Sequence, residues 1–175
     1  MRFFQTAISA LLIGTAFAAA ASAQKTRPRR AEPSKPPASR GVAPLDVRAA
    51  REKVETQRWN TSQFIDVLGP IAQEIENTSE AAKRQNLPRS IIDKNEQNKK
   101  RVIAAIRNLR VGIANLESEF RTRSSLRRYL STIQGATDLV ASSEDLALAG
   151  KFVAAKDPLR DVLKKLTDTL NVMPK

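Results

Sequence analysis

The densest cationic feature of the chain is a group of four arginines, Arg121, Arg123, Arg127 and Arg128. No acidic residue occurs between Glu119 and Asp138. Clustered guanidinium groups can clamp carboxylates or phosphates through paired hydrogen bonds. The pattern therefore predicts an anion-binding surface, and an ordinary solvated helix surface is the alternative interpretation.

Two further features could join this surface. Lys99 and Lys100 form a second basic cluster with Arg101, and Trp59 is the only tryptophan. A tryptophan at a helix junction most often closes the end of a core, although tryptophans are also over-represented among binding hot spots. We predict that Lys99, Lys100 and Trp59 contact the partner together with the four arginines.

The sequence offers little for catalysis. It contains no histidine and no cysteine, which removes thiol nucleophiles, Ser-His pairs and the commonest zinc ligands. The acidic pairs Glu74–Glu76 and Glu117–Glu119 are spaced by two residues, so each pair falls on different faces of a helix and does not form a metal site. We expect no cofactor, no metal and no enzymatic activity, with a carboxylate-based enzyme as the remaining catalytic alternative.

The net charge of +12 favours an acidic partner. Residues 24–44 contribute +5, from six basic residues and one acid, and residues 45–175 contribute +6, from twenty-three basic residues and seventeen acids. An anionic protein face or an anionic lipid surface would meet this charge. Nucleic acid is not an expected partner, because two scattered aromatics, Trp59 and Tyr129, cannot form a platform for stacking bases.

The N-terminal segment predicts export. Residues 1–23 have a positive start, an apolar run and a small-residue cleavage pattern, as in a cleaved signal peptide. Residues 24–44 contain five prolines and almost no apolar bulk, so we predict a disordered basic arm that serves as a linker or a transit segment. The helical domain is expected to cover residues 45–175.

The apolar spacing from residue 45 onward predicts helices throughout. A short leading helix covers about 45–59, and Asn60–Ser62 offers a break with a new N-cap. The second helix extends to Leu87–Pro88, with a kink or a short break at Gly69–Pro70.

The third helix begins with a capping signal at Ser90 and carries the most regular core stripe in the chain, Val102, Ile106, Leu109, Ile113, Leu116 and Phe120. A turn at Thr122–Ser125 separates it from a fourth helix over about 124–147. That fourth helix buries Leu126, Leu130, Ile133, Ala136 and Val140.

The last helix follows a stop at Gly150 and begins at Asp157–Pro158, where an N-cap precedes a proline. Its predicted core stripe is Leu159, Leu163, Leu166, Leu170 and Met173, and Pro174 ends it. The predicted fold class is all-α: an antiparallel up-down four-helix bundle with a short leading helix and a disordered basic arm.

Several of these residues are similar to the PsbQ family, the extrinsic four-helix-bundle subunits on the lumenal side of photosystem II. Trp59, Phe64–Ile65 and Gly69–Pro70 resemble the family's leading helix and the opening of its next helix, and Leu87–Pro88 resembles the close of that helix. At the C-terminus, Phe152, Ala154, Ala155 and Val172–Pro174 are similar in type and spacing to its last helix. The resemblance covers about half of the domain.

The targeting segment has a plastid interpretation and a bacterial one. Thr15–Ala18 resembles the cleavage motif of secondary plastids, which would place the mature start near Val42 in the thylakoid lumen. An ordinary bacterial signal peptide would instead leave Gln24 first. The chain departs from the family pattern in a longer middle region, in Pro158 and in the lack of a second apolar segment.

The resemblance implies a non-enzymatic extrinsic subunit that docks on photosystem II and supports the oxygen-evolving complex. Its partner would be an acidic protein surface of that membrane complex. The alternative is a bacterial periplasmic bundle that acts as an adaptor or binds an anionic envelope polymer or lipid.

Overall fold

The computed structural model describes residues 43–175, which are all-helical, with no strand in this range. The signal peptide predicted at 1–23 and all but the last two residues of the predicted arm lie outside the described residues. No helix within 43–175 has both the length and the apolar character needed to cross a membrane. The helices are α1 (Leu45–Arg84), α2 (Arg89–Thr122), the 3-10 helix η1 (Arg127–Tyr129), α3 (Leu130–Ile133), α4 (Ala136–Leu148) and α5 (Lys156–Val172).

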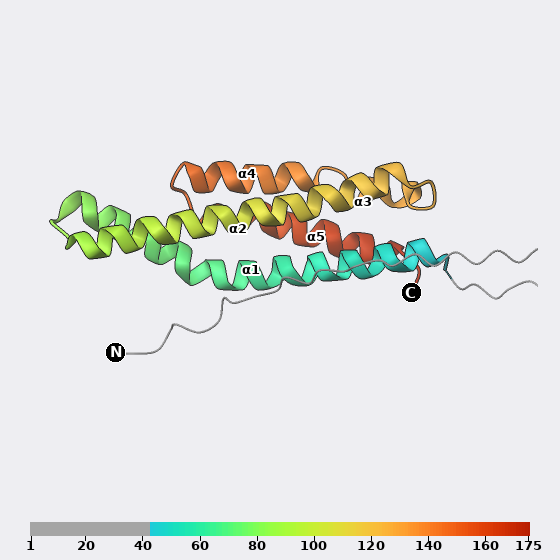
Figure 1. The fold of residues 1–175 in the computed structure, drawn as a ribbon, viewed down its shortest axis with the longest axis horizontal. Helices are drawn as coiled ribbons and strands as arrows, with labels where there is room; N and C mark the ends of the chain where they lie inside the picture. The colour runs from blue at the N-terminus through green and yellow to red at the C-terminus, as the bar shows by residue number, and fades with distance from the viewer. Residues whose placement is uncertain (1–42) are drawn as a thin grey trace, which may run out of the picture. The chain divides into compact units, whose positions relative to one another are not determined.

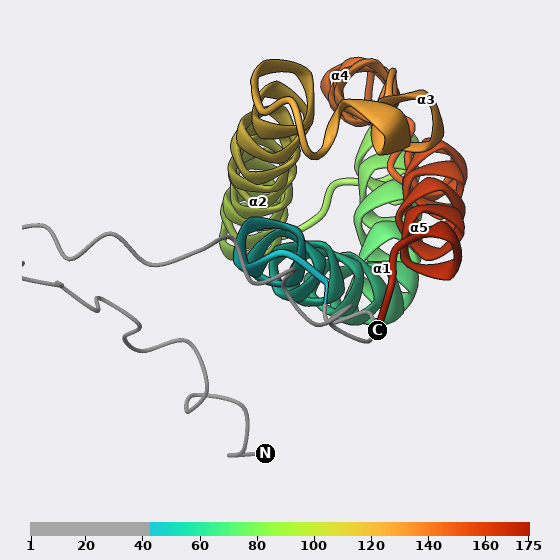
Figure 2. The same cartoon turned by 90° about the vertical axis from the view of Figure 1, so that its right-hand side faces the viewer.

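The four longer helices pack in a closed order. Helix α1 packs against α2 and α5, and α4 also packs against α2 and α5 (Figure 2). Figure 1 shows that α1 and α4 run in one direction while α2 and α5 run in the other. Short connections between sequential helices produce this alternation.

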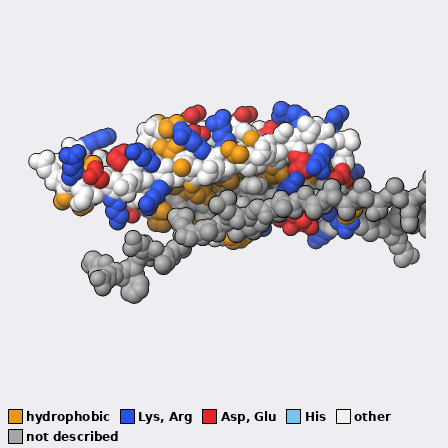
Figure 3. Space-filling view, in the orientation of Figure 1, with side chains coloured by type: hydrophobic (Ala, Val, Ile, Leu, Met, Phe, Trp, Pro, Cys, Tyr) orange, Lys and Arg blue, Asp and Glu red, His pale blue; other side chains and the backbone are white. Residues whose placement is uncertain are grey.

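The core lies between these helices and follows the predicted apolar stripes. On α2 every predicted stripe residue is buried except Leu109, which is partly buried. On α5, Leu163 and Leu170 are partly buried and the rest of the stripe is buried. Lysine, arginine and acidic side chains are spread over the outer face seen in Figure 3.

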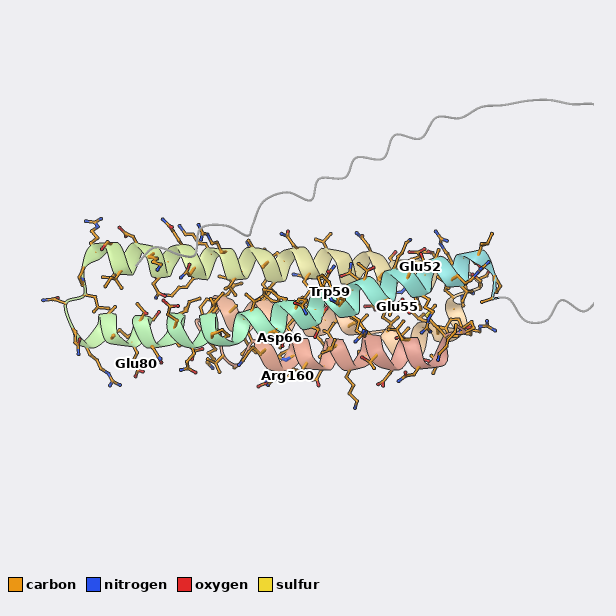
Figure 4. All side chains as sticks on the ribbon, turned by 90° about the horizontal axis from the view of Figure 1, so that it is seen from below. Glu52, Glu55, Trp59, Asp66, Glu80 and Arg160 are labelled. Carbon is orange, nitrogen blue, oxygen red and sulfur yellow. The ribbon has the colours of Figure 1, made fainter. Side chains whose placement is uncertain are left out.

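Helix α1 corrects one prediction and confirms another. It is continuous over 40 residues, so the separate leading helix and the break at Asn60–Ser62 are wrong. Thr61 is fully buried and its hydroxyl donates to the carbonyl of Gln57 at 2.7 Å, which satisfies the side chain inside a helix. The expected kink occurs: the helix axis changes direction beside Asp66, whose carbonyl lacks an amide partner at Pro70 (Figure 4).

The region after α2 differs from the single fourth helix that the sequence predicted. Helix α2 begins at Arg89 behind Pro88 with no side-chain cap, so the cap at Ser90 is wrong, whereas the predicted turn after Thr122 is confirmed. The predicted helix over 124–147 is divided into η1, α3 and α4. Gly135, at a φ of 82°, makes the left-handed turn that ends α3 and starts α4.

Helix α5 begins at Lys156 behind Ala155, which provides no side-chain cap, so the predicted N-cap at Asp157 is wrong; Asp157 and Pro158 both lie in the first turn. Gly150 lies in the preceding connection at a φ of 79°, as expected of a helix stop. The far end of α5 is tied to α1, because the Arg51 guanidinium donates to the carbonyls of Leu170 and Met173 at 2.7 and 2.9 Å.

Candidate functional site

The four predicted arginines lie together at the end of the helices where α2 stops. We call Arg121, Arg123, Arg127 and Arg128 the arginine end. Figure 2 looks onto this end, where α1 begins and the chain passes from α2 through η1 to α3. All four residues are exposed. Arg121 and Arg123 also extend the C-terminus of α2, where positive charge is favourable beside unpaired carbonyls.

The loop that carries the arginines is pinned to the core. Leu126 is fully buried and Tyr129 is 7% exposed, and these two residues bracket Arg127 and Arg128. The amides of Leu126 and Arg127 both donate to the Arg123 carbonyl at 3.1 Å. Buried anchors and backbone hydrogen bonds therefore hold the arginine end in one conformation before any partner arrives.

Carboxylates under the arginine end orient two of its side chains. The Arg121 guanidinium donates to Glu117 at 3.3 Å, and Arg123 Nη2 lies 3.1 Å from Glu119 Oε1, an ion pair without hydrogen-bond geometry. Glu119 also accepts from Lys53 of α1 at 2.7 Å. A guanidinium has five N–H donors, so Arg121 and Arg123 keep most of theirs for an external anion.

Glu117 also caps helix α4 from across the structure. Its carboxylate accepts from the amides of Gly135 and Thr137, both at 3.2 Å, and from the Thr137 hydroxyl at 2.9 Å. Burial raises the pKa of Glu117, but these hydrogen bonds and the charge of Arg121 outweigh it, so the net pKa is lowered. The ionised carboxylate thus joins the end of α2 to the start of α4.

Asp46 ties the same loop to the first turn of α1. The Ser125 hydroxyl donates to the Asp46 carboxylate, and this hydrogen bond is the main reason that the pKa of Asp46 is lowered. Arg123 lowers that pKa further by its charge. The acids of this end therefore lie inward and bind the scaffold, while the arginines extend outward.

Arg127 and Arg128 form no ion pair within residues 43–175. The Arg128 guanidinium lies over the Tyr129 ring, 4.7 Å from its centre. This cation–π contact limits its rotation, and Arg128 remains exposed. These two side chains are the most available cations at the arginine end.

Lys99 and Lys100 lie far from the arginine end. Lys99 and Arg121 are on the same helix, and 22 residues of α helix span roughly 33 Å. Lys99 pairs with Glu96 at 2.7 Å, whereas Lys100 is exposed. The structure therefore does not gather the predicted lysines and arginines into one surface.

Trp59 lies on the outward face of α1 and is 60% exposed, so the interpretation of a core plug is wrong. Glu52, Glu55 and Asp66 lie along the same side of the helix (Figure 4). Trp59 lies 14 residues of helix beyond Leu45, roughly 21 Å from the start of α1 at the arginine end. Trp59 therefore belongs to a different surface from the arginines.

Sequence reasoning missed the carboxylates that orient the arginines. Glu117 and Glu119 each precede an arginine by four residues, the spacing at which side chains meet on a helix. That signal was readable from the sequence. The contacts of Glu117 with α4, and of Ser125 with Asp46, join residues far apart in the chain and carry no local signal.

Among the described residues, no group of three or more acidic side chains converges as a cation site would require. Comparison of the chain with protein-family models, with curated proteins and with solved structures found no match.

Proposed function

We propose that residues 45–172 form an up-down four-helix bundle that acts as a non-enzymatic docking subunit. The closed packing order of α1, α2, α4 and α5, with alternating directions, supports this architecture. In this proposal the arginine end binds an acidic protein surface. The helices serve to hold that end rigid.

The observation that carries the proposal is the separation of charges at the arginine end. Four guanidiniums are exposed, one on the last turn of α2 and three on the pinned segment that follows it, while Asp46, Glu117 and Glu119 lie beneath them and bind the scaffold. A rigid cationic surface loses little conformational entropy on docking. Paired N–H donors suit carboxylates on a partner protein.

The resemblance in sequence supports a choice of partner. We propose that the acidic surface belongs to photosystem II, on the lumenal side of the plastid thylakoid, and that docking supports the oxygen-evolving complex. A bacterial periplasmic adaptor remains the second candidate. The N-terminus of the native protein distinguishes them, because a start near Val42 supports the plastid and a start at Gln24 supports the periplasm.

The docking test is rebinding to photosystem II membranes stripped of extrinsic subunits by salt. The variant R127E/R128E reverses the two unpaired charges, and K151E/K164E reverses two exposed lysines that also form no ion pair within residues 43–175, as the matched control. We expect the first variant to lose at least tenfold in affinity and the control to bind like wild type, because buried charge pairs across an interface contribute about 1.5 kcal/mol or more each.

Salt provides the second readout of the same experiment. Wild-type binding is expected to weaken steeply as ionic strength rises, since exposed charges are screened over about 10 Å at 0.1 M salt. Equal binding by R127E/R128E and wild type, or affinity that ignores salt, would contradict the proposal.

A further inference from the structure

The connection between α1 and α2 projects beyond the other helices. Figure 1 shows this connection extending past the ends of α4 and α5. The last buried residue of α1 is Ile75 and the first buried residue of α2 is Asn95, and none of residues 76–94 is buried. We call residues 83–94 the hairpin tip. The hairpin tip lies at the end of α2 opposite the arginine end.

The hairpin tip exposes aliphatic side chains next to one another. Ile91 is 45% exposed and Ile92 is 36% exposed, and Leu87 in the connecting loop is partly exposed. Exposed apolar residues are ordinary on a protein surface, so these side chains indicate a contact only in combination with the charges around them. The two isoleucines occupy the first turn of α2, the turn nearest the connection to α1.

Cations surround these aliphatic side chains. Within residues 80–94, which include the acid that pairs with Arg84, four basic side chains stand against two acids, Glu80 and Asp93, which gives a net charge of +2. Arg84 pairs with Glu80 at 2.5 Å, whereas Lys83, Arg89 and Lys94 have no ion pair in the part of the chain that the structure describes. Blue, orange and red side chains lie together at this end of the view in Figure 3.

We propose that the hairpin tip is a docking surface for an anionic lipid bilayer. In this arrangement Ile91 and Ile92 enter the boundary between headgroups and acyl chains, and Arg89 and Lys94 bind lipid phosphates. A projecting, convex tip fits a bilayer, which deforms around it, better than it fits a rigid protein face. Aliphatic side chains ringed by cations are the composition by which surface-bound helices hold to anionic membranes.

This docking surface goes beyond the proposed function of the arginine end. The 34 residues of α2 place the two ends roughly 50 Å apart, several times the distance over which salt screens charge. One end could therefore bind a membrane while the other binds a protein. Failure of either interaction leaves the other intact and testable.

The first experiment measures sedimentation of the full chain with vesicles of phosphatidylcholine containing phosphatidylglycerol. Wild type is expected to bind these vesicles and to bind pure phosphatidylcholine at least tenfold more weakly. The variant I91S/I92S should lose about tenfold, since each methylene withdrawn from the acyl region weakens binding. R89E/K94E should lose at least about twentyfold, because each cation near an anionic surface contributes about a fivefold factor in affinity.

The matched control is V111S/L148S, which removes two exposed aliphatic side chains from the sides of the molecule. Val111 is 60% exposed and Leu148 is 56% exposed, so they are at least as accessible as the isoleucines. The control should bind vesicles like wild type. Equal losses in the control and in I91S/I92S would overturn the proposal, and so would equal binding to neutral and anionic vesicles.

A second experiment reports which part of the molecule enters the lipid. The variant W59F/I92W moves the single tryptophan to the hairpin tip, while wild-type Trp59 lies 25 residues of helix before Arg84, roughly 38 Å away. Lipids brominated on their acyl chains should quench W59F/I92W and leave Trp59 unquenched. Quenching of Trp59 alone would overturn the proposal. A dimer of wild type that I91S/I92S abolishes would also overturn it, because a second copy of the chain would then occupy the tip.

Discussion

The two ends of the helical domain present positive charge in different ways. At the arginine end the loop is anchored by Leu126 and Tyr129, and carboxylates beneath it orient Arg121 and Arg123. At the hairpin tip no residue is buried, and the cations lie beside exposed aliphatic side chains. The comparison indicates that a rigid cationic surface suits a partner of fixed shape, and a loosely packed apolar one suits a deformable partner.

The same comparison predicts where the protein keeps its stability. The arginine end depends on buried side chains and on hydrogen bonds between elements distant in sequence. The hairpin tip has only α1 and α2 to hold it together. Mutations of similar chemistry should therefore have different consequences at the two ends.

The largest effect is expected from Leu126→Ala compared with Ile91→Ala. Leu126 is fully buried under the arginine end, so its truncation leaves a cavity and should lower the free energy of unfolding by about 2–5 kcal/mol. Ile91 is 45% exposed, so its truncation should change that free energy by no more than about 0.5 kcal/mol. Urea denaturation followed by circular dichroism measures both; equal losses would show that the two ends are packed alike.

The next effect concerns the carboxylate that joins α2 to α4. Glu117→Ala should cost about 2 kcal/mol, because the amides of Gly135 and Thr137 lose a charged acceptor. Glu52→Ala on the exposed face of α1 is the matched control and should be close to neutral. An equal loss of stability in both variants would show that Glu117 does not stabilise the junction of α2 and α4.

The pH dependence of stability gives the sign of the Glu117 contribution. Its pKa is lowered in the folded protein, so the folded state holds fewer protons than the unfolded state in acid. The stabilisation is therefore present at neutral pH and is lost as the pH falls through the lowered pKa. Melting temperatures of wild type and Glu117→Ala should converge in acid, and a gap that widens there would contradict this sign.

A smaller effect is expected at the turn between α3 and α4. Gly135→Ala adds a methyl group that meets no atom within 4 Å, but it forces a residue with a side chain to a φ of 82°. The strain should cost about 1 kcal/mol, measured by thermal unfolding. The turn also helps to position the arginine end. If Gly135→Ala lowers partner affinity by more than it lowers the free energy of unfolding, Gly135 positions the arginines as well as stabilising the fold.

The smallest effect on stability is expected from R127E/R128E. Both side chains are exposed, and neither pairs with a carboxylate within the described residues, so only the lost contact of Arg128 with the Tyr129 ring, about 0.5–1 kcal/mol, should lower the free energy of unfolding. Urea denaturation checks this value. A large loss of stability would mean that these arginines hold the fold together and are not free for a partner.

The sequence predicted the features that depend on local spacing. The stripe from Val102 to Phe120, the turn after Thr122 and the clustering of the arginines all follow from residue type and period. The break at Asn60–Ser62 was wrong because Thr61 bonds back to Gln57 within the helix. The division of the fourth helix at Gly135 depends on Glu117, and a contact between residues so far apart cannot be read from either segment alone.

The proposal that one end binds protein and the other binds lipid is tested most directly by measuring both interactions for both charge variants. Each of R127E/R128E and R89E/K94E is assayed for binding to salt-stripped photosystem II membranes and to vesicles containing phosphatidylglycerol. We predict that R127E/R128E loses binding to photosystem II membranes but keeps vesicle binding. We predict that R89E/K94E loses vesicle binding but keeps its binding to the protein of photosystem II membranes. A variant that loses both interactions together, with its fold intact, would contradict the account.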